Sequence, residues 1–136
     1  MADAYSRVSG KLGVALTSAG TGAGNAAGAI IESWNGGAPL LHVTGTVASN
    51  FVDTGRGYIH DCKDQFGMLR SISKEAHRVR RPEQASTVFR HAITEAGLGS
   101  NVSQRSSAGI GTSLWTAYHG RCETRKRKQH TIWFRT

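Results

Sequence analysis

The stretch Thr17-Ser18-Ala19-Gly20-Thr21-Gly22-Ala23-Gly24-Asn25 decides the fold, because it joins two segments of different kind. An apolar run, residues 13–16, precedes it, and an alanine-rich segment, residues 26–34, follows it. This order predicts a buried strand, a glycine-rich turn and a helix. Glycines let a ligand approach the main chain closely, and the free N–H groups at a helix N-terminus favour anionic or electron-rich groups. A turn that holds no ligand has the same spacing, so spacing alone leaves both interpretations open.

Helix and strand signals alternate on both sides of this turn. Residues 2–8 have the character of the end of a helix, which stops at Ser9-Gly10. The expected strands lie near 13–17, 39–44 and 76–79, and the expected helices lie near 24–35, 65–70 and 82–96. Strands that alternate with helices predict an α/β fold with a parallel sheet.

Pro82 to Ala96 is the clearest helix. Its apolar residues recur at steps of three and four, at Ala85, Val88, Phe89, Ala92, Ile93 and Ala96. Such a stripe packs inward, so we assign it to the core rather than to a binding face. Pro82 suits the first helical position, whereas Arg81 is a poor N-cap that weakens the helix start by about 1 kcal/mol.

Length and composition favour one globular domain of 136 residues, of which 38% are hydrophobic. No apolar run is long enough to cross a bilayer, and the N-terminus does not have the pattern of a signal peptide. Cys62 and Cys122 are far apart and have no C-x-x-C partner, which argues against a zinc site built on them. These features together predict a cytoplasmic protein with two reduced thiols.

The net charge of +8 is spread unevenly along the chain. Residues 1–96 carry 10 Lys/Arg and 8 Asp/Glu, whereas residues 97–136 carry 7 Lys/Arg and a single acid, Glu123. The balance is therefore +2 in the first part and +6 in the second. This difference divides the chain into a body, residues 1–96, and a basic tail, residues 97–136.

Three segments of the body carry a family resemblance. They are an A-D-A-Y-x-R run at residues 2–7, the turn at 17–25 and a P-L-x-x-x-T-G segment at 39–45. Together they resemble the N-terminal pyrimidine-binding domain of thiamine-diphosphate-dependent enzymes of the acetolactate synthase-like branch. The family's turn is T-S-G-P-G-A-x-N; here Thr21 replaces the proline and Gly24 adds one residue. The resemblance covers roughly residues 1–96.

The resemblance implies a fold, a cofactor and partners. The fold is part of a three-layer parallel sheet, and the cofactor is thiamine diphosphate, whose pyrimidine side meets Gly20, Thr21, Gly22 and Asn25. Family members are homodimers or homotetramers with the active site at the subunit interface, and they act on 2-keto acids or acyl donors. The family also needs magnesium, but its G-D-G…N-N signature is not in this sequence, so we name no metal ligand.

Catalytic residues are harder to assign by resemblance. The glutamate that activates the family's cofactor lies before the A-D-A-Y segment, and Asp3 is matched to the helix instead. This chain begins after that glutamate, so we expect a fragment that is catalytically silent by itself. His60 in the polar loop 45–64 stands near the family's Gln-Glu pair and is the one candidate proton shuttle. A solvated loop histidine is the alternative interpretation.

The resemblance stops after Ala96, where the family continues with a G-P-V-x-V-x-I-P strand in the centre of the sheet. The polar, glycine-rich sequence that follows instead suggests a change of reading frame at about residue 97, and we expect an irregular tail with few contacts to the body. The basic run Arg121–Lys128, with aromatic residues around it, supports a rival function: binding to nucleic acid or an anionic surface. A charge run is more often simply solvated, so nucleic-acid binding is the weaker hypothesis.

Overall fold

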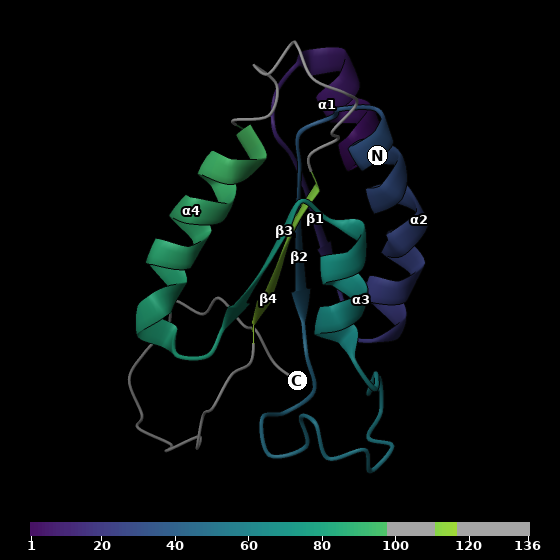
Figure 1. Cartoon of the computed structure of the whole chain (residues 1–136), viewed down its shortest axis with the longest axis vertical. Helices are drawn as coiled ribbons and strands as arrows, with labels where there is room; N and C mark the ends of the chain where they lie inside the picture. The colour runs from purple at the N-terminus through teal and green to yellow at the C-terminus, as the bar shows by residue number, and fades with distance from the viewer. Residues whose placement is uncertain (98–110, 117–136) are drawn as a thin grey trace, which may run out of the picture.

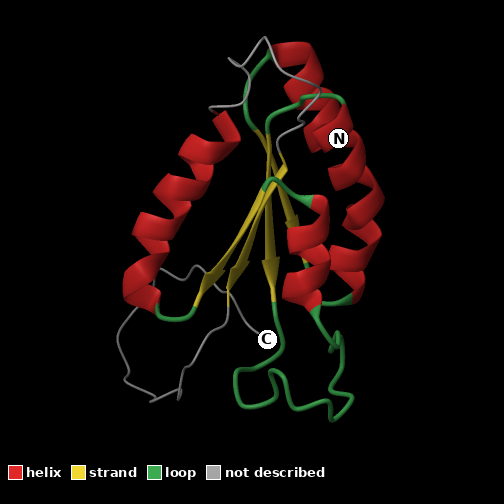
Figure 2. Cartoon of the chain, viewed as in Figure 1, coloured by secondary structure: helices red, strands yellow, loops and turns green. Residues whose placement is uncertain are grey.

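A parallel sheet of four strands lies between two layers of helices (Figures 1 and 2). The computed structural model describes residues 1–97 and 111–116 of the chain. The elements are α1 (Ala2–Ser9), β1 (Gly13–Thr17), α2 (Thr21–Asn35), β2 (Leu40–Gly45), α3 (Gln65–Ile72), β3 (Glu75–Val79), a 3-10 turn (Pro82–Gln84), α4 (Ala85–Gly97) and β4 (Gly111–Thr116). The expected α/β class with a parallel sheet is therefore confirmed.

The strands follow the order β1-β2-β4-β3, and every neighbouring pair is parallel. Figure 1 shows α4 on one face of the sheet and α1, α2 and α3 on the other. Adjacent residues of β2 belong to the hydrophobic clusters on opposite faces of the sheet, because successive side chains of a strand point to opposite sides. Leu40 packs with Ile30 of α2 and Leu69 of α3, whereas Leu41 packs with Val79 of β3 and Ala92 of α4.

The apolar stripe of α4 belongs to the core, as predicted. Ala92 and Ala96 are fully buried, and Val88 and Phe89 pack against the cluster around Leu41. Ile93 departs from the prediction because it lies at the border of the stripe and is 46% exposed. The helical segment starts at Pro82, and Arg81 in front of it makes no side-chain capping hydrogen bond, as expected of a poor N-cap.

The structure corrects the prediction for part of the basic tail. Residues 111–116 form β4, which pairs with β2 on one side and β3 on the other, so this segment is neither irregular nor free of contacts with the body. The segment contains threonine, leucine and tryptophan, residue types that favour strands, and the overall polarity of the tail obscured this signal. The hypothesis of a changed reading frame stays a prediction, which the nucleotide sequence would test. The remainder of the tail lies outside the described residues.

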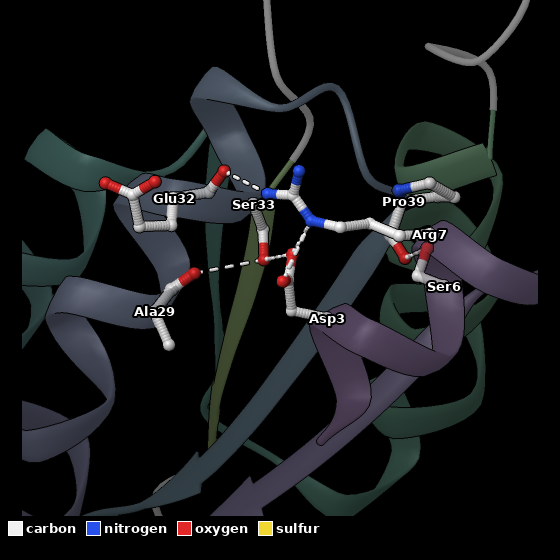
Figure 3. Close-up of polar contacts among 7 residues, drawn as sticks. All are labelled: Asp3, Ser6, Arg7, Ala29, Glu32, Ser33 and Pro39. Atoms are coloured by element: carbon white, nitrogen blue, oxygen red, sulfur yellow. Dashed lines mark hydrogen bonds and ion pairs between the residues drawn. The ribbon is translucent and has the colours of Figure 1, made fainter.

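Asp3 and Arg7 fasten α1 to the end of α2 (Figure 3). The Arg7 Nε donates to the Asp3 carboxylate at 2.9 Å, and Arg7 Nη2 donates to the main-chain oxygen of Glu32 at 2.8 Å. Ser33 of α2 donates to the same carboxylate at 2.8 Å. Asp3 and Arg7 are thus spaced by one helical turn, which places both side chains on the face of α1 that meets α2.

The same network sets the charge of Asp3. Burial raises the pKa of this carboxyl, but the hydrogen bonds from Arg7 and Ser33 and the positive charge of Arg7 outweigh burial, so its pKa lies below the ordinary value. Ser6, which is buried, adds a hydrogen bond to the main-chain oxygen of Pro39 at 2.8 Å. The A-D-A-Y-x-R run therefore has a structural role: it docks α1 against α2 and the start of β2.

Candidate functional site

The glycine-rich turn and the polar loop lie at the same edge of the sheet. The turn follows the carboxyl end of β1, and the loop of residues 46–64 follows the carboxyl end of its parallel neighbour β2. Figure 2 shows the loop extending beyond the strand ends at this edge. In parallel α/β sheets, ligands bind outside the carboxyl ends of the strands, so this edge is the candidate site.

The three glycines of the turn differ in what surrounds them. Gly20 has φ 53° and ψ −96°, and a Cβ there would overlap the main-chain oxygen of His60. A Cβ on Gly22 would overlap the Ser18 hydroxyl, whereas a Cβ on Gly24 would meet no atom within 4 Å. Gly20 and Gly22 therefore serve the packing of the turn itself, and only the exposed face at Gly24 is open to a ligand.

Gln65 holds the turn to the end of β2. Its Oε1 accepts a hydrogen bond from the Gly20 main-chain N–H at 2.7 Å, and its Nε2 donates to the Gly45 main-chain oxygen at 2.8 Å. The side chain is only 5% exposed; its bond with Gly20 is buried and its bond with Gly45 is partly buried. The sequence analysis missed this residue, because a glutamine at the start of a short helix carries no signal of a contact 45 positions away.

The fold brings two of the candidate residues together. The Thr21 hydroxyl lies 3.2 Å from Nδ1 of His60, although the residues are 39 positions apart. His60 is exposed and has φ 62°, a left-handed conformation that points its main-chain oxygen at Gly20. Asn25 lies one turn farther along α2 with an exposed side chain. Thr21, Asn25 and His60 thus offer hydrogen-bonding groups on the accessible side of the turn.

A buried histidine lies beneath the turn. Nε2 of His42 lies 2.9 Å from the Thr17 hydroxyl, and the ring is 1% exposed. Burial lowers the pKa of His42 to about 4, so the ring is neutral at physiological pH. The neighbouring Thr44 hydroxyl donates to the main-chain oxygen of Ser18 at 2.9 Å. The polar groups at the ends of β1 and β2 therefore support the turn from inside.

A small hollow opens beside the turn, between the loop and β3. Arg78 lies over the ring of Phe66, 5.1 Å from its centroid, and its Nη1 is 3.7 Å from Asp53 Oδ2. Burial lowers the pKa of Arg78, and the charge of Asp53 partly offsets this effect. The lining is mostly polar and includes Thr46, Asp53, Asp61, Cys62, Asp64 and Gln65.

Two features of the sequence analysis belong to the tail, and a third concerns membrane-spanning segments. The basic run Arg121–Lys128 and Cys122 fall outside the described residues. In residues 1–97, no helix is long and apolar enough to span a bilayer.

Known proteins resemble the N-terminal part of the chain. Residues 1–68, half of the chain, match the family described as "Thiamine pyrophosphate enzyme, N-terminal TPP binding domain". The acetolactate synthase large subunit of Buchnera aphidicola subsp. Schizaphis graminum is 35% identical over 99 residues, which cover 73% of this chain and 17% of that protein. The same subunit of Haemophilus influenzae is 31% identical over 99 residues, which also cover 73% of this chain and 17% of that protein.

The probable 2-ketoarginine decarboxylase of Pseudomonas aeruginosa is 35% identical over 92 residues, which cover 68% of this chain and 16% of that protein. The chain thus spans only 16–17% of the length of these relatives. The family match over residues 1–68 contains the glycine-rich turn.

Proposed function

Since the chain belongs to the thiamine pyrophosphate enzymes, through their N-terminal TPP binding domain, we propose that its glycine-rich turn contacts the pyrimidine side of thiamine diphosphate. The residues of this proposed site are Gly20, Thr21, Gly22 and Asn25: Thr21 and Asn25 touch the ring, and the two glycines shape the turn that presents them. Thiamine diphosphate, when bound, would supply stabilisation of negative charge on the carbonyl carbon of the substrate. The turn contributes orientation, by hydrogen bonds from its main chain and from Thr21 and Asn25.

The observation that carries this proposal is the accessible face of the turn at the carboxyl edge of the sheet. Gly24 is open, and Thr21 and Asn25 are exposed beside it. These groups are neutral donors and acceptors, which fit an aminopyrimidine ring, since such a ring also carries both. Gly20 is buried, and a Cβ on Gly22 would overlap the Ser18 hydroxyl, so the two glycines act by shaping the turn rather than by touching the ring.

The activity of the whole enzyme is part of the same proposal. We assign it to the acetolactate synthase-like group, which acts on 2-keto acids or acyl donors with magnesium, in a cytoplasmic oligomer whose active site lies between subunits. His60 is the proposed proton shuttle, held by Thr21 at the rim of the turn. The turn by itself provides a few hydrogen bonds of roughly 0.5–1.5 kcal/mol each, and rigid-body association costs more, so we expect millimolar affinity at best from this chain.

The test is a titration followed by amide chemical shifts of the full chain. We expect thiamine diphosphate with magnesium, at millimolar concentration, to shift the amides of residues 21–25. The free aminopyrimidine should shift the same amides, whereas inorganic diphosphate should not. The Asn25→Ala variant should weaken the response, and Asn35→Ala, at the opposite end of the same helix, should leave it unchanged.

Two results would contradict the proposal. An unchanged spectrum at millimolar aminopyrimidine would remove the turn as the contact. Shifts with diphosphate alone would show that the helix N-terminus binds anions and not the pyrimidine. Micromolar affinity, or turnover of pyruvate by the purified chain, would refute the expectation that this chain is silent by itself.

A further inference from the structure

Three potential metal ligands meet at the opposite end of the sheet from the turn. Glu75 and His77 belong to β3, which begins at Glu75, and His91 belongs to α4. Oε2 of Glu75 lies 3.0 Å from Nε2 of His77 and 3.7 Å from Nε2 of His91. All three ligand atoms lie within 4.8 Å of one another.

The fold explains why these side chains converge. Glu75 and His77 are two residues apart on a strand, so they point to the same face of the sheet as Val79, which packs against α4. Figure 1 shows α4 running beside β3. The ring of His91 meets that of His77 edge to face, with centroids 5.0 Å apart. Lys74, directly before β3, forms an ion pair of 3.1 Å with Glu95 of α4 near the cluster.

The cluster contains a polar atom that the described residues leave without a hydrogen bond. Nε2 of His77 is buried and has no hydrogen-bond partner within the described part of the chain. Its 3.0 Å approach to Glu75 is an ion-pair distance without hydrogen-bond geometry. A buried nitrogen without a partner destabilises the fold, and coordination of a cation by its lone pair would remove that penalty.

We infer that Glu75, His77 and His91 form a zinc-binding site that joins β3 to α4. Two imidazoles and one carboxylate are a ligand set that zinc prefers, and three protein ligands leave the fourth tetrahedral position to water. Zinc bonds of about 2.1 Å place tetrahedral ligands roughly 3.4 Å apart, close to the two distances measured from Glu75. Glu75 and His91 are partly exposed, so the ion has a route of entry.

The inference is independent of thiamine diphosphate. It uses none of the residues of the turn or of the loop that follows β2. The sequence carried one signal for it, the Glu-x-His spacing in a strand, which places two ligands on one face. His91 could not be added to that pair before the packing of α4 was known.

Calorimetric zinc titration of the full chain, together with thermal unfolding, tests the site. We expect zinc to raise Tm, because an ion that binds only the folded state stabilises it by mass action, and magnesium to have no effect, because it prefers six oxygen ligands. Glu75→Gln and His91→Asn should each weaken zinc binding at least about tenfold and abolish the Tm increase. Both residues are partly exposed, so both variants should fold.

His60→Asn is the matched control, since it removes an exposed histidine elsewhere and should bind zinc like the parent chain. The affinity should also fall as pH is lowered, because protons compete with zinc for the imidazoles. If Glu75→Gln and His91→Asn bind zinc as the parent does, the ion is held by other residues. If zinc leaves Tm unchanged, the cluster is an ion pair only. Either result would overturn the inference.

Discussion

At the scale of single residues, His42 makes stability depend on pH. The folded-state pKa of this buried ring is about 4, and the ordinary value is 6.5, so between these values the unfolded chain binds the proton and the folded chain does not. The free energy of unfolding therefore suffers no loss from His42 above pH 6.5, and it decreases as the pH falls from 6.5 toward 4. The loss amounts to about 3 kcal/mol, at roughly 1.4 kcal/mol per pH unit.

Urea unfolding at pH 7, 5.5 and 4.5 measures this dependence. The His42→Gln variant keeps a polar side chain opposite Thr17 but does not titrate, so its stability should change less over the same range. His60→Gln, which removes an exposed ring, should retain the dependence of the parent chain. A parent chain equally stable at pH 7 and 4.5 would show that His42 is not shielded from water.

At the scale of elements, the strand–turn–helix unit depends on Gly20. The backbone at Gly20 has a positive φ of 53°, which a residue with a side chain rarely adopts, and a Cβ there would overlap the main-chain oxygen of His60. Gly20→Ala should therefore destabilise the chain by about 1–3 kcal/mol, measured by denaturant unfolding. Gly24→Ala is the matched control, because its Cβ has open space within the helix and alanine favours helix over glycine. If both variants changed the free energy of unfolding equally, the conformation of Gly20 would not be what the turn requires.

At the scale of the whole molecule, β1 is the edge strand next to β2, with no further strand beside it among the described residues. Two of its apolar side chains, Val14 and Leu16, are 50% and 65% exposed, and the strand itself contains no charged residue. Such edges promote association through strand pairing. We expect the purified chain to self-associate and to bind hydrophobic dyes, and Leu16→Lys to reduce both, as measured by sedimentation and dye fluorescence.

Val8→Lys provides the comparison for this edge. Val8 is 90% exposed but lies in α1, so its replacement should change association little. If the parent chain sediments as a monomer, binds no dye and melts in a sharp reversible transition, β1 does not drive self-association.

The sequence alone determined the class of the fold and most of its elements. The turn at 17–25, the stripe of α4 and the alternation of strands and helices are local patterns, set by spacing within a few residues. The family resemblance was readable for the same reason, since its motifs are short and contiguous. The place of β4 was not readable, because the composition of the tail obscured one short strand whose partners lie far away in the chain.

Only the tertiary structure decided which side chains meet. The bridge of Gln65 to Gly20, the contact of His60 with Thr21 and the cluster of Glu75, His77 and His91 join residues on different elements. Parallel strands bring their carboxyl ends to one edge, and helix packing fixes which faces touch. Both effects depend on strand order and on the side of the sheet each helix covers, and no local pattern in the sequence encodes either.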